Sequence, residues 1–389
     1  MTLYDAERDG ALTPRHATGP GPKTHAIIIG VGHYLHLPGG GGDPVKDSMD
    51  LEQLTSPLES ARAFAKWVVE ELNNPRAPLG SVELLTSPPI DFTLPNGVSQ
   101  QSSRATMSEI QMAFDRWYER SNSDAGNVAI FYFCGHGVMG RNLALLAEDY
   151  GVRPLAPFQT AIDLDVTWQG MGRCKAETQC FFIDSCRQAT WVMQKQLTNP
   201  AIALVSSEFG GWSDRDAPCY MATGPGGSAY GMSGGITLFP RVLLECLKRG
   251  ARNVDGHWVV TTLRLSEAIS LAMKELRENS ERPRQMGAGY APTKGNTIHE
   301  LLGPPEVPVS LCCRPEAATE HAKLEMFFSS PPGKPRYSRE APAPHRWELW
   351  ALAGHYIARA TFMNKKFRGG KHNFWVDPPG PINENIPVR

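Results

Sequence analysis

The chain has 389 residues, and its 39 basic and 40 acidic side chains leave a net charge of −1. This length favours one large domain with an appendage, or two domains. The balanced charge, without a run of five or six like charges, argues against a nucleic-acid or membrane-surface partner. The longest apolar stretches are shorter than the roughly 18 residues that a membrane-spanning helix needs.

The N-terminal residues 1–23 are polar and rich in Pro and Gly, which predicts a flexible tail and not a secretory signal. Eight cysteines are spread over the chain without a Cys-x-x-Cys pair. This distribution favours free thiols in a reducing compartment over a disulfide scaffold, so we expect a cytoplasmic protein.

Between residues 25 and 276, short apolar runs alternate with amphipathic helical patterns. Helices are expected at 57–72, 106–118, 162–171, 188–197, 238–247 and 263–276, and a loop at 87–104. Strands are expected at 25–31, 82–85, 128–134, 178–184, 201–206 and 219–223. This alternation is typical of a mostly parallel sheet with helices on both faces.

The composition changes near Gly303. Nine prolines between positions 304 and 344 predict a linker or a loosely built segment over 304–346. Residues 347–389 are aromatic and alternating, which predicts a small β-rich unit. Trp347, Trp350 and Tyr356 are expected in its core.

Two of the expected strands end next to reactive side chains. The run ending at Cys134 is followed by Gly135-His136-Gly137, and the run ending at Asp184 by Ser185-Cys186. Both runs are short and rich in β-branched and aromatic residues, as buried strands of parallel sheets are. Lying side by side, they would deliver a thiol and an imidazole to the edge where open α/β sheets place their chemistry.

A thiol is a useful nucleophile only as a thiolate, and a neighbouring imidazole can take its proton. The alternative is a buried core thiol at Cys186 and a turn residue at His136. Cys134 is expected to pack in the core. His33 and His36 have no Cys or carboxylate partner at ligand spacing, so no metal site is predicted.

Together the two motifs resemble the caspase-like cysteine peptidases, which comprise caspases, metacaspases and paracaspases. The interval of about fifty residues between the His and Cys motifs is the one known for caspases. Asp-Ser-Cys is closer to metacaspases and paracaspases than to animal caspases. Met221 to Tyr230 resembles the first strand and loop of the caspase small subunit. The resemblance covers residues 24–303 and implies a caspase-like α/β/α sandwich, large-subunit-like to about 206 and small-subunit-like from about 217.

The resemblance implies an endopeptidase in which Cys186 is the nucleophile and His136 the general acid and base, without an evident third triad member. The backbone N–H groups of Gly137 and Cys186 would hold the oxyanion. The implied substrate-binding residues are Asp184, Ser60, Ala222, Ser228 and Tyr230.

Substrate choice depends on Asp184, which matches the carboxylate that binds Arg or Lys in metacaspases and paracaspases. A turn-capping role is the alternative for this residue. Ser60 stands where the family has a second acid, and Gly231 where animal caspases have the Arg that binds aspartate. We therefore expect cleavage after Arg or Lys.

The compact architecture resembles prokaryotic relatives, which suggests a zymogen in regulated cell death or defence against phage. Its expected partners are a protein substrate and an activating protease or sensor protein. Activation could also come from cleavage of this chain in an exposed loop such as 208–216. No cofactor is implied, although calcium dependence stays open. The alternative function is a catalytically silent scaffold that acts through protein contacts, and the presence of both His136 and Cys186 argues against it.

Overall fold

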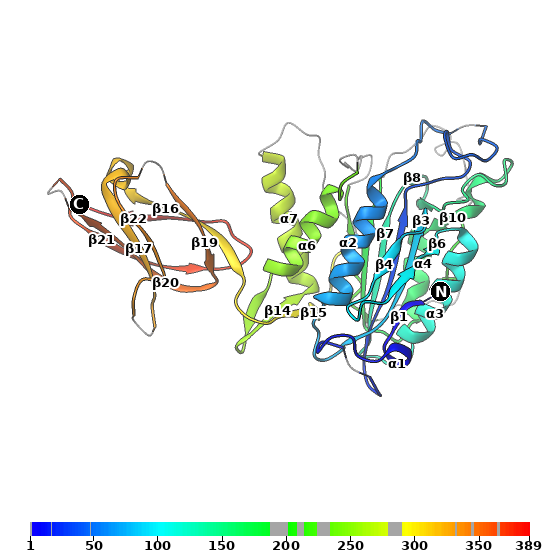
Figure 1. The fold of residues 1–389 in the computed structure, drawn as a ribbon, viewed down its shortest axis with the longest axis horizontal. Coiled ribbons are helices and arrows are strands. Elements are labelled where there is room, and N and C mark those ends of the chain that lie inside the picture. Colours follow the sequence, from blue (N-terminus) through cyan, green and yellow to red (C-terminus); the bar gives the residue numbers. More distant parts are fainter. Residues whose placement is uncertain are drawn as a thin grey trace. The chain divides into compact units, whose positions relative to one another are not determined.

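The computed structural model in Figure 1 describes residues 2–16, 18–46, 48–186, 201–207, 214–223, 234–278, 290–330, 333–343, 346–363 and 366–389. The chain divides into two compact units. The first comprises Met1–Leu244 and Thr261–Glu300, and the second Glu245–Val260 and Leu301–Arg389. Among the helices in these ranges, none is both long and apolar enough to cross a membrane.

The first unit is built on a sheet with the strand order β1-β3-β2-β7-β11-β12, and β6 pairs with β3. All pairs are parallel except β1 with β3. β2, β7 and β11 are buried along their whole length, which explains their continuous apolar sequences. The bounds are Thr2–Asp5 for β1, Thr24–Val31 for β2, Leu79–Ser87 for β3, Ser103–Arg104 for β6, Val128–Cys134 for β7, Thr178–Asp184 for β11 and Cys219–Met221 for β12.

Helices cover both faces of this sheet (Figure 1). Phe64 of α2 (Ser56–Glu70) stacks on Tyr132 of β7, whereas Trp117 of α3 (Met107–Ser121) contacts the neighbouring Phe131. Consecutive strand residues point to opposite faces, so the two helices lie on opposite sides. The other helices are α4 (Leu164–Gly170), α6 (Leu238–Arg249), α7 (Thr262–Glu278), and the 3-10 turns η1 (Pro157–Thr160) and η2 (Met171–Arg173).

Smaller strands complete the first unit. β8 (Gly137–Met139), β9 (Leu143–Leu146) and β10 (Ala161–Asp163) form an antiparallel sheet directly after β7. β15 spans Thr297–Leu301. The expected loop 87–104 contains a hairpin of β4 (Asp91–Thr93) and β5 (Ser99–Gln101), besides β6.

The strand predicted at 201–206 is wrong. Ile202 alone makes an isolated bridge, exchanging backbone hydrogen bonds with the Ala161 carbonyl (2.8 Å) and the Asp163 N–H (2.9 Å). The pairing stops there because the Leu204 N–H donates to the Thr167 side chain instead (3.0 Å). The predicted helix 188–197 lies outside the described residues.

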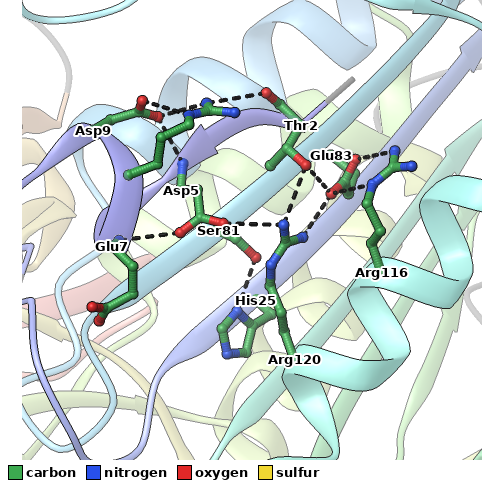
Figure 2. A network of polar contacts seen from close by, with 10 residues as sticks. Thr2, Asp5, Glu7, Asp9, His25, Ser81, Glu83, Arg116 and Arg120 are labelled. Carbon is green, nitrogen blue, oxygen red and sulfur yellow. Dashed lines mark hydrogen bonds and ion pairs between the residues drawn. The ribbon is translucent and has the colours of Figure 1, made fainter.

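The predicted flexible tail at 1–23 is also wrong, since Thr2–Asp5 forms β1 and Ala6–Asp9 forms α1. The cause is Glu83 of β3, which is 1% exposed and accepts hydrogen bonds from Thr2 (2.7 Å), Arg116 (2.8 Å) and Arg120 (2.7 Å). Arg120 also pairs with Asp5 at 3.0 Å. Figure 2 shows how these side chains join β1, β3 and α3. A buried carboxylate needs such partners, and they hold the N-terminus in place.

The second unit contains a β-sandwich with the sheets β19-β16-β22 and β18-β17-β20-β21. The predicted linker 304–346 is wrong, because three of these strands and the turn η3 (Glu316–His321) lie in it. Val307, Val309 and Leu311 alternate into the core, and this period of two decides the structure despite the prolines. The bounds are Glu306–Arg314 for β16, Ala322–Phe328 for β17, Tyr337–Arg339 for β18, Trp347–Leu352 for β19, Gly354–Phe362 for β20, Gly370–Val376 for β21 and Ile382–Pro387 for β22.

Residues 347–389 are therefore the second half of the sandwich and not a separate unit. Trp347 and Tyr356 lie in its core as predicted, whereas Trp350 is 47% exposed and its ring is covered by the Arg249 guanidinium at 4.2 Å. The second unit also holds the hairpin strands β13 (Arg252–Val254) and β14 (His257–Thr261).

Candidate active site

Two neighbouring strands bring His136 and Cys186 to one edge of the central sheet. β7 and β11 pair in register from Val128 with Thr178 to Cys134 with Asp184. His136 and Cys186 each follow this last pair by two residues. The prediction that these two strands lie side by side is therefore confirmed, and both motifs lie beyond the carboxyl ends of the strands.

The two turns that follow β7 and β11 are packed directly against each other. The Gly135 N–H donates to the Asp184 carbonyl at 3.2 Å. A Cβ atom on Gly137 would lie 2.6 Å from the Cys186 carbonyl oxygen and 2.6 Å from Ser185 Oγ. Only glycine permits this approach, because a Cβ atom would push the two turns apart.

The His136 ring is held in one orientation. Its Nε2 lies 2.7 Å from the Glu52 carbonyl oxygen, and its backbone N–H donates to Tyr34 Oη at 2.7 Å. The Tyr34 ring packs on the imidazole with 4.9 Å between centroids. Since a carbonyl only accepts, Nε2 carries the proton and Nδ1 is the basic nitrogen of the neutral ring.

Burial lowers the pKa of His136 below its ordinary value, although the bond to Glu52 acts in the opposite direction. The imidazole is therefore neutral near pH 7 and able to accept a proton. Glu52 and Tyr34 were not found from the sequence. The Glu52 carbonyl was missed because a backbone carbonyl has no sequence signature. Tyr34 was missed because its position depends on a loop contact. The Gln53 side chain accepts a hydrogen bond from the Tyr34 N–H (2.8 Å) and donates one to the Tyr34 carbonyl (3.0 Å).

The cysteines differ in exposure. Cys186 is partly exposed, whereas the other seven are buried, and none of the eight forms a disulfide. The prediction that Cys134 packs in the core is confirmed, since it is 1% exposed. A buried core position, the alternative for Cys186, does not fit the structure.

Asp184 is 2% exposed, and within the described ranges one of its two carboxylate oxygens is hydrogen-bonded. Its Oδ2 accepts hydrogen bonds from the Thr237 hydroxyl and from Cys134 Sγ (3.2 Å). Its Oδ1 is buried without a hydrogen-bond partner among the described residues. Burial raises the pKa of Asp184 to about 6, while the bonds from Thr237 and Cys134 act against this. Both bonds come from other elements, which does not fit the turn-capping alternative.

Ser60 is linked to Asp184 indirectly, through Thr237 and through Cys134. The Ser60 hydroxyl lies 3.1 Å from the Thr237 hydroxyl and accepts from the Thr237 N–H at 3.1 Å. Ala222 is buried after β12, and its N–H donates to the Ile183 carbonyl at 2.9 Å. Ser228, Tyr230 and Gly231 lie outside the described residues. Thr237 was missed because it follows Ser60 by 177 residues and only the fold brings them together.

A family model described as Caspase domain matches residues 23–323. An uncharacterized protein of Sinorhizobium fredii, y4kE, is 29% identical over 259 residues, which make up 65% of this chain and 74% of that protein. A crystal structure of caspase-1 from Spodoptera frugiperda has 14% sequence identity and a TM-score of 0.38, covering 72% of this chain and 93% of that one. The family match spans most of the chain and agrees with the mostly parallel sheet between helices, so the predicted fold class is confirmed. The chain therefore belongs to the caspase family.

Proposed function

We propose that this protein is a cysteine endopeptidase that cuts protein substrates after Arg or Lys with a Cys186–His136 dyad. The observation that carries the proposal is the register of β7 and β11, which sets both turns at one sheet edge. The Glu52 carbonyl, which fixes the imidazole, and the exposure of Cys186 support it.

In the proposed reaction, His136 Nδ1 takes the proton of the Cys186 thiol, and the thiolate attacks the scissile carbonyl carbon. The N–H groups of Gly137 and Cys186 stabilise the oxyanion of the tetrahedral intermediate. Collapse breaks the C–N bond, and His136 gives its proton to the leaving amine. Water, deprotonated by His136, then hydrolyses the thioester and returns the thiol.

Asp184 supplies the proposed specificity. No described residue gives the buried Asp184 carboxylate a cationic partner, and such a carboxylate favours a positively charged side chain because the ion pair offsets the desolvation of the charge. In the proposal, Asp184 Oδ1 receives the Arg or Lys that precedes the cut bond. Ser228 and Tyr230 remain predicted pocket residues.

Fluorogenic peptides ending in Arg, Lys and Asp test this function. The purified full-length chain and its Cys186→Ala variant are compared before and after limited proteolysis, with calcium and with EDTA. We expect turnover of the basic peptides by the wild type alone. If no Cys186-dependent turnover occurs under any of these conditions, the scaffold function replaces the peptidase; a preference for the Asp peptide overturns only the specificity.

The proposal includes a regulated role. Activation by a sensor protein or by cleavage, in cell death or defence against phage, rests on the resemblance to prokaryotic relatives. A cytoplasmic location agrees with eight unbridged cysteines. Of the loop 208–216, only Asp214 to Asp216 are among the described residues.

A further inference from the structure

We propose that Thr237 and Cys134 restrict the Asp184 carboxylate to one available oxygen, so that the substrate pocket accepts Lys at least as well as Arg. This inference rests on the proposed function and specifies its substrate. Thr237 and Cys134 both donate to Oδ2 of Asp184, while Oδ1 is buried without a partner in the described part of the chain.

Arginine and lysine use a carboxylate differently. A guanidinium gains most from two parallel hydrogen bonds, one to each carboxylate oxygen. An ammonium is a compact charge that needs only one oxygen for a strong ion pair. Because Oδ2 is already occupied, an Arg side chain in this pocket loses the second bond, whereas a Lys side chain loses nothing.

Among the described residues, the groups around Asp184 do not supply a second carboxylate. Ser60 stands where the family has its second acid, and its hydroxyl is already bonded to Thr237. Tyr132 follows the cluster one residue pair further back on β7, and its hydroxyl interacts with Cys134 and Ser60, so it belongs to the cluster and brings no second carboxylate. From the described part of the chain, the spare N–H donors of a guanidinium would thus find no second carboxylate, and leaving such donors unpaired is costly.

The charge of the cluster does not distinguish the two cations. Among the described residues its ionisable groups are Asp184, Cys134 and Tyr132. Burial, together with the nearby charge of Asp184, raises the pKa of Cys134 and of Tyr132 well above their ordinary values, so both are neutral. The pocket therefore offers a single negative charge, which suits either cation equally and leaves geometry to decide.

The test compares Thr237→Ala, which uncovers Oδ2 and leaves space beside it, with Thr237→Ser, which keeps the hydroxyl. On matched Arg and Lys peptides we expect a wild-type ratio of kcat/KM, Arg over Lys, of about 1 or below. Thr237→Ala should raise this ratio about tenfold, and Thr237→Ser should stay within about twofold of the wild type. Cys134→Ala, which removes the other donor, should raise it in the same direction. A wild-type ratio of 3 or more, or a ratio that Thr237→Ala leaves within about twofold of the wild type, would overturn the inference.

A binding measurement separates this inference from the proposed function. Calorimetric titration of the Cys186→Ala protein with agmatine, a guanidinium, and cadaverine, an ammonium, needs no turnover. We expect agmatine to gain affinity over cadaverine only when Thr237→Ala is added. This result with no peptide cleavage would refute the peptidase and keep the pocket. Equal effects of Thr237→Ala on both amines, or no binding of either, would refute the pocket.

Discussion

Two buried carboxylates of the central sheet show opposite behaviour. Glu83 in the middle of β3 and Asp184 at the end of β11 are 1% and 2% exposed. Burial alone would raise both pKa values, but the hydrogen bonds of Glu83 to Arg116, Thr2 and Arg120 bring its pKa below the ordinary value. In the part of the chain that the structure describes, Asp184 accepts hydrogen bonds from a hydroxyl and a thiol and has no cation beside it, so burial raises its pKa to about 6.

The difference between them is the presence of a cation. The Glu83 cluster in Figure 2 is complete within the chain and serves to attach the N-terminal strand. Asp184 is buried at the edge that carries the candidate active site, yet one of its oxygens has no described partner. The first carboxylate is therefore completed by the fold itself, whereas under the proposed function a substrate cation would complete the second.

Neutralising Asp184 should have the largest effect on catalysis. Asp184→Asn should lower kcat/KM on Lys and Arg peptides at least 100-fold, because the buried counter-charge of the substrate is lost; this equals about 2.7 kcal/mol of transition-state binding. A peptide with norleucine in the same position serves as a control and should lose less than threefold. Equal losses on the charged and uncharged peptides would show that Asp184 acts on the fold or the dyad instead.

Neutralising Glu83 should have the opposite profile. Glu83→Gln leaves Arg116 and Arg120 without their shared anion, and we expect a loss of about 2 kcal/mol in the free energy of unfolding with kcat/KM unchanged. This loss of unfolding free energy is smaller than for a fully buried ion pair, because the side chains of Arg116 and Arg120 are 35% and 25% exposed. Urea denaturation at pH 7.5 measures it.

Glu267→Gln is the matched control for this variant, since Glu267 is 61% exposed in its pair with Arg264. It should cost less than about 0.5 kcal/mol. If Glu83→Gln costs no more than this control, the buried cluster does not hold the N-terminal strand.

The sequence pointed to Asp184 but not to Glu83, and the reason is distance along the chain. Asp184 is two residues from the nucleophile motif, and the strands around it are continuous apolar runs that predict their own burial. Glu83 depends on Thr2, 81 residues away, and on Arg116 and Arg120. A polar N-terminal strand held by such contacts has no local signature, and the residues 1–23 therefore resembled a tail.

The same limit applies within the site. His136 and Cys186 flank strand ends and could be named from the sequence. Thr237, which occupies Oδ2 of Asp184, and the Glu52 carbonyl, which orients His136, depend on the tertiary fold. In the second unit, the many prolines led to the prediction of a linker, although Val307, Val309 and Leu311 alternate as the core residues of a strand do.

The two carboxylates should also affect the pH dependence of stability in opposite directions. The folded-state pKa of Asp184, about 6, exceeds its unfolded value near 3.9, so the folded protein binds the proton more tightly and loses stability as pH rises through 6. Asp184→Asn removes this loss. We expect the variant to gain about 1–2 kcal/mol over the wild type between pH 5 and pH 8, measured by urea denaturation.

Glu83 has the reverse sign. Its lowered pKa gives stability that is present above pH 4–5 and lost as pH falls, so the deficit of Glu83→Gln should shrink below pH 4. A pH-independent difference between Asp184→Asn and the wild type would mean that Asp184 is not desolvated in solution.

The smallest expected effect comes from one hydrogen bond at the N-terminal strand. Thr2→Val keeps the shape of the side chain and removes the hydroxyl that donates to Glu83 at 2.7 Å. Because Arg116 and Arg120 still neutralise Glu83, we expect a loss of only about 1 kcal/mol in unfolding free energy, with unchanged peptide cleavage. Amide hydrogen exchange in β1 should increase while exchange in β7 stays constant, since opening the edge strand does not require opening the centre of the sheet. Equal changes in both strands would show that β1 unfolds only together with the whole sheet, and would make the Glu83 cluster part of the core.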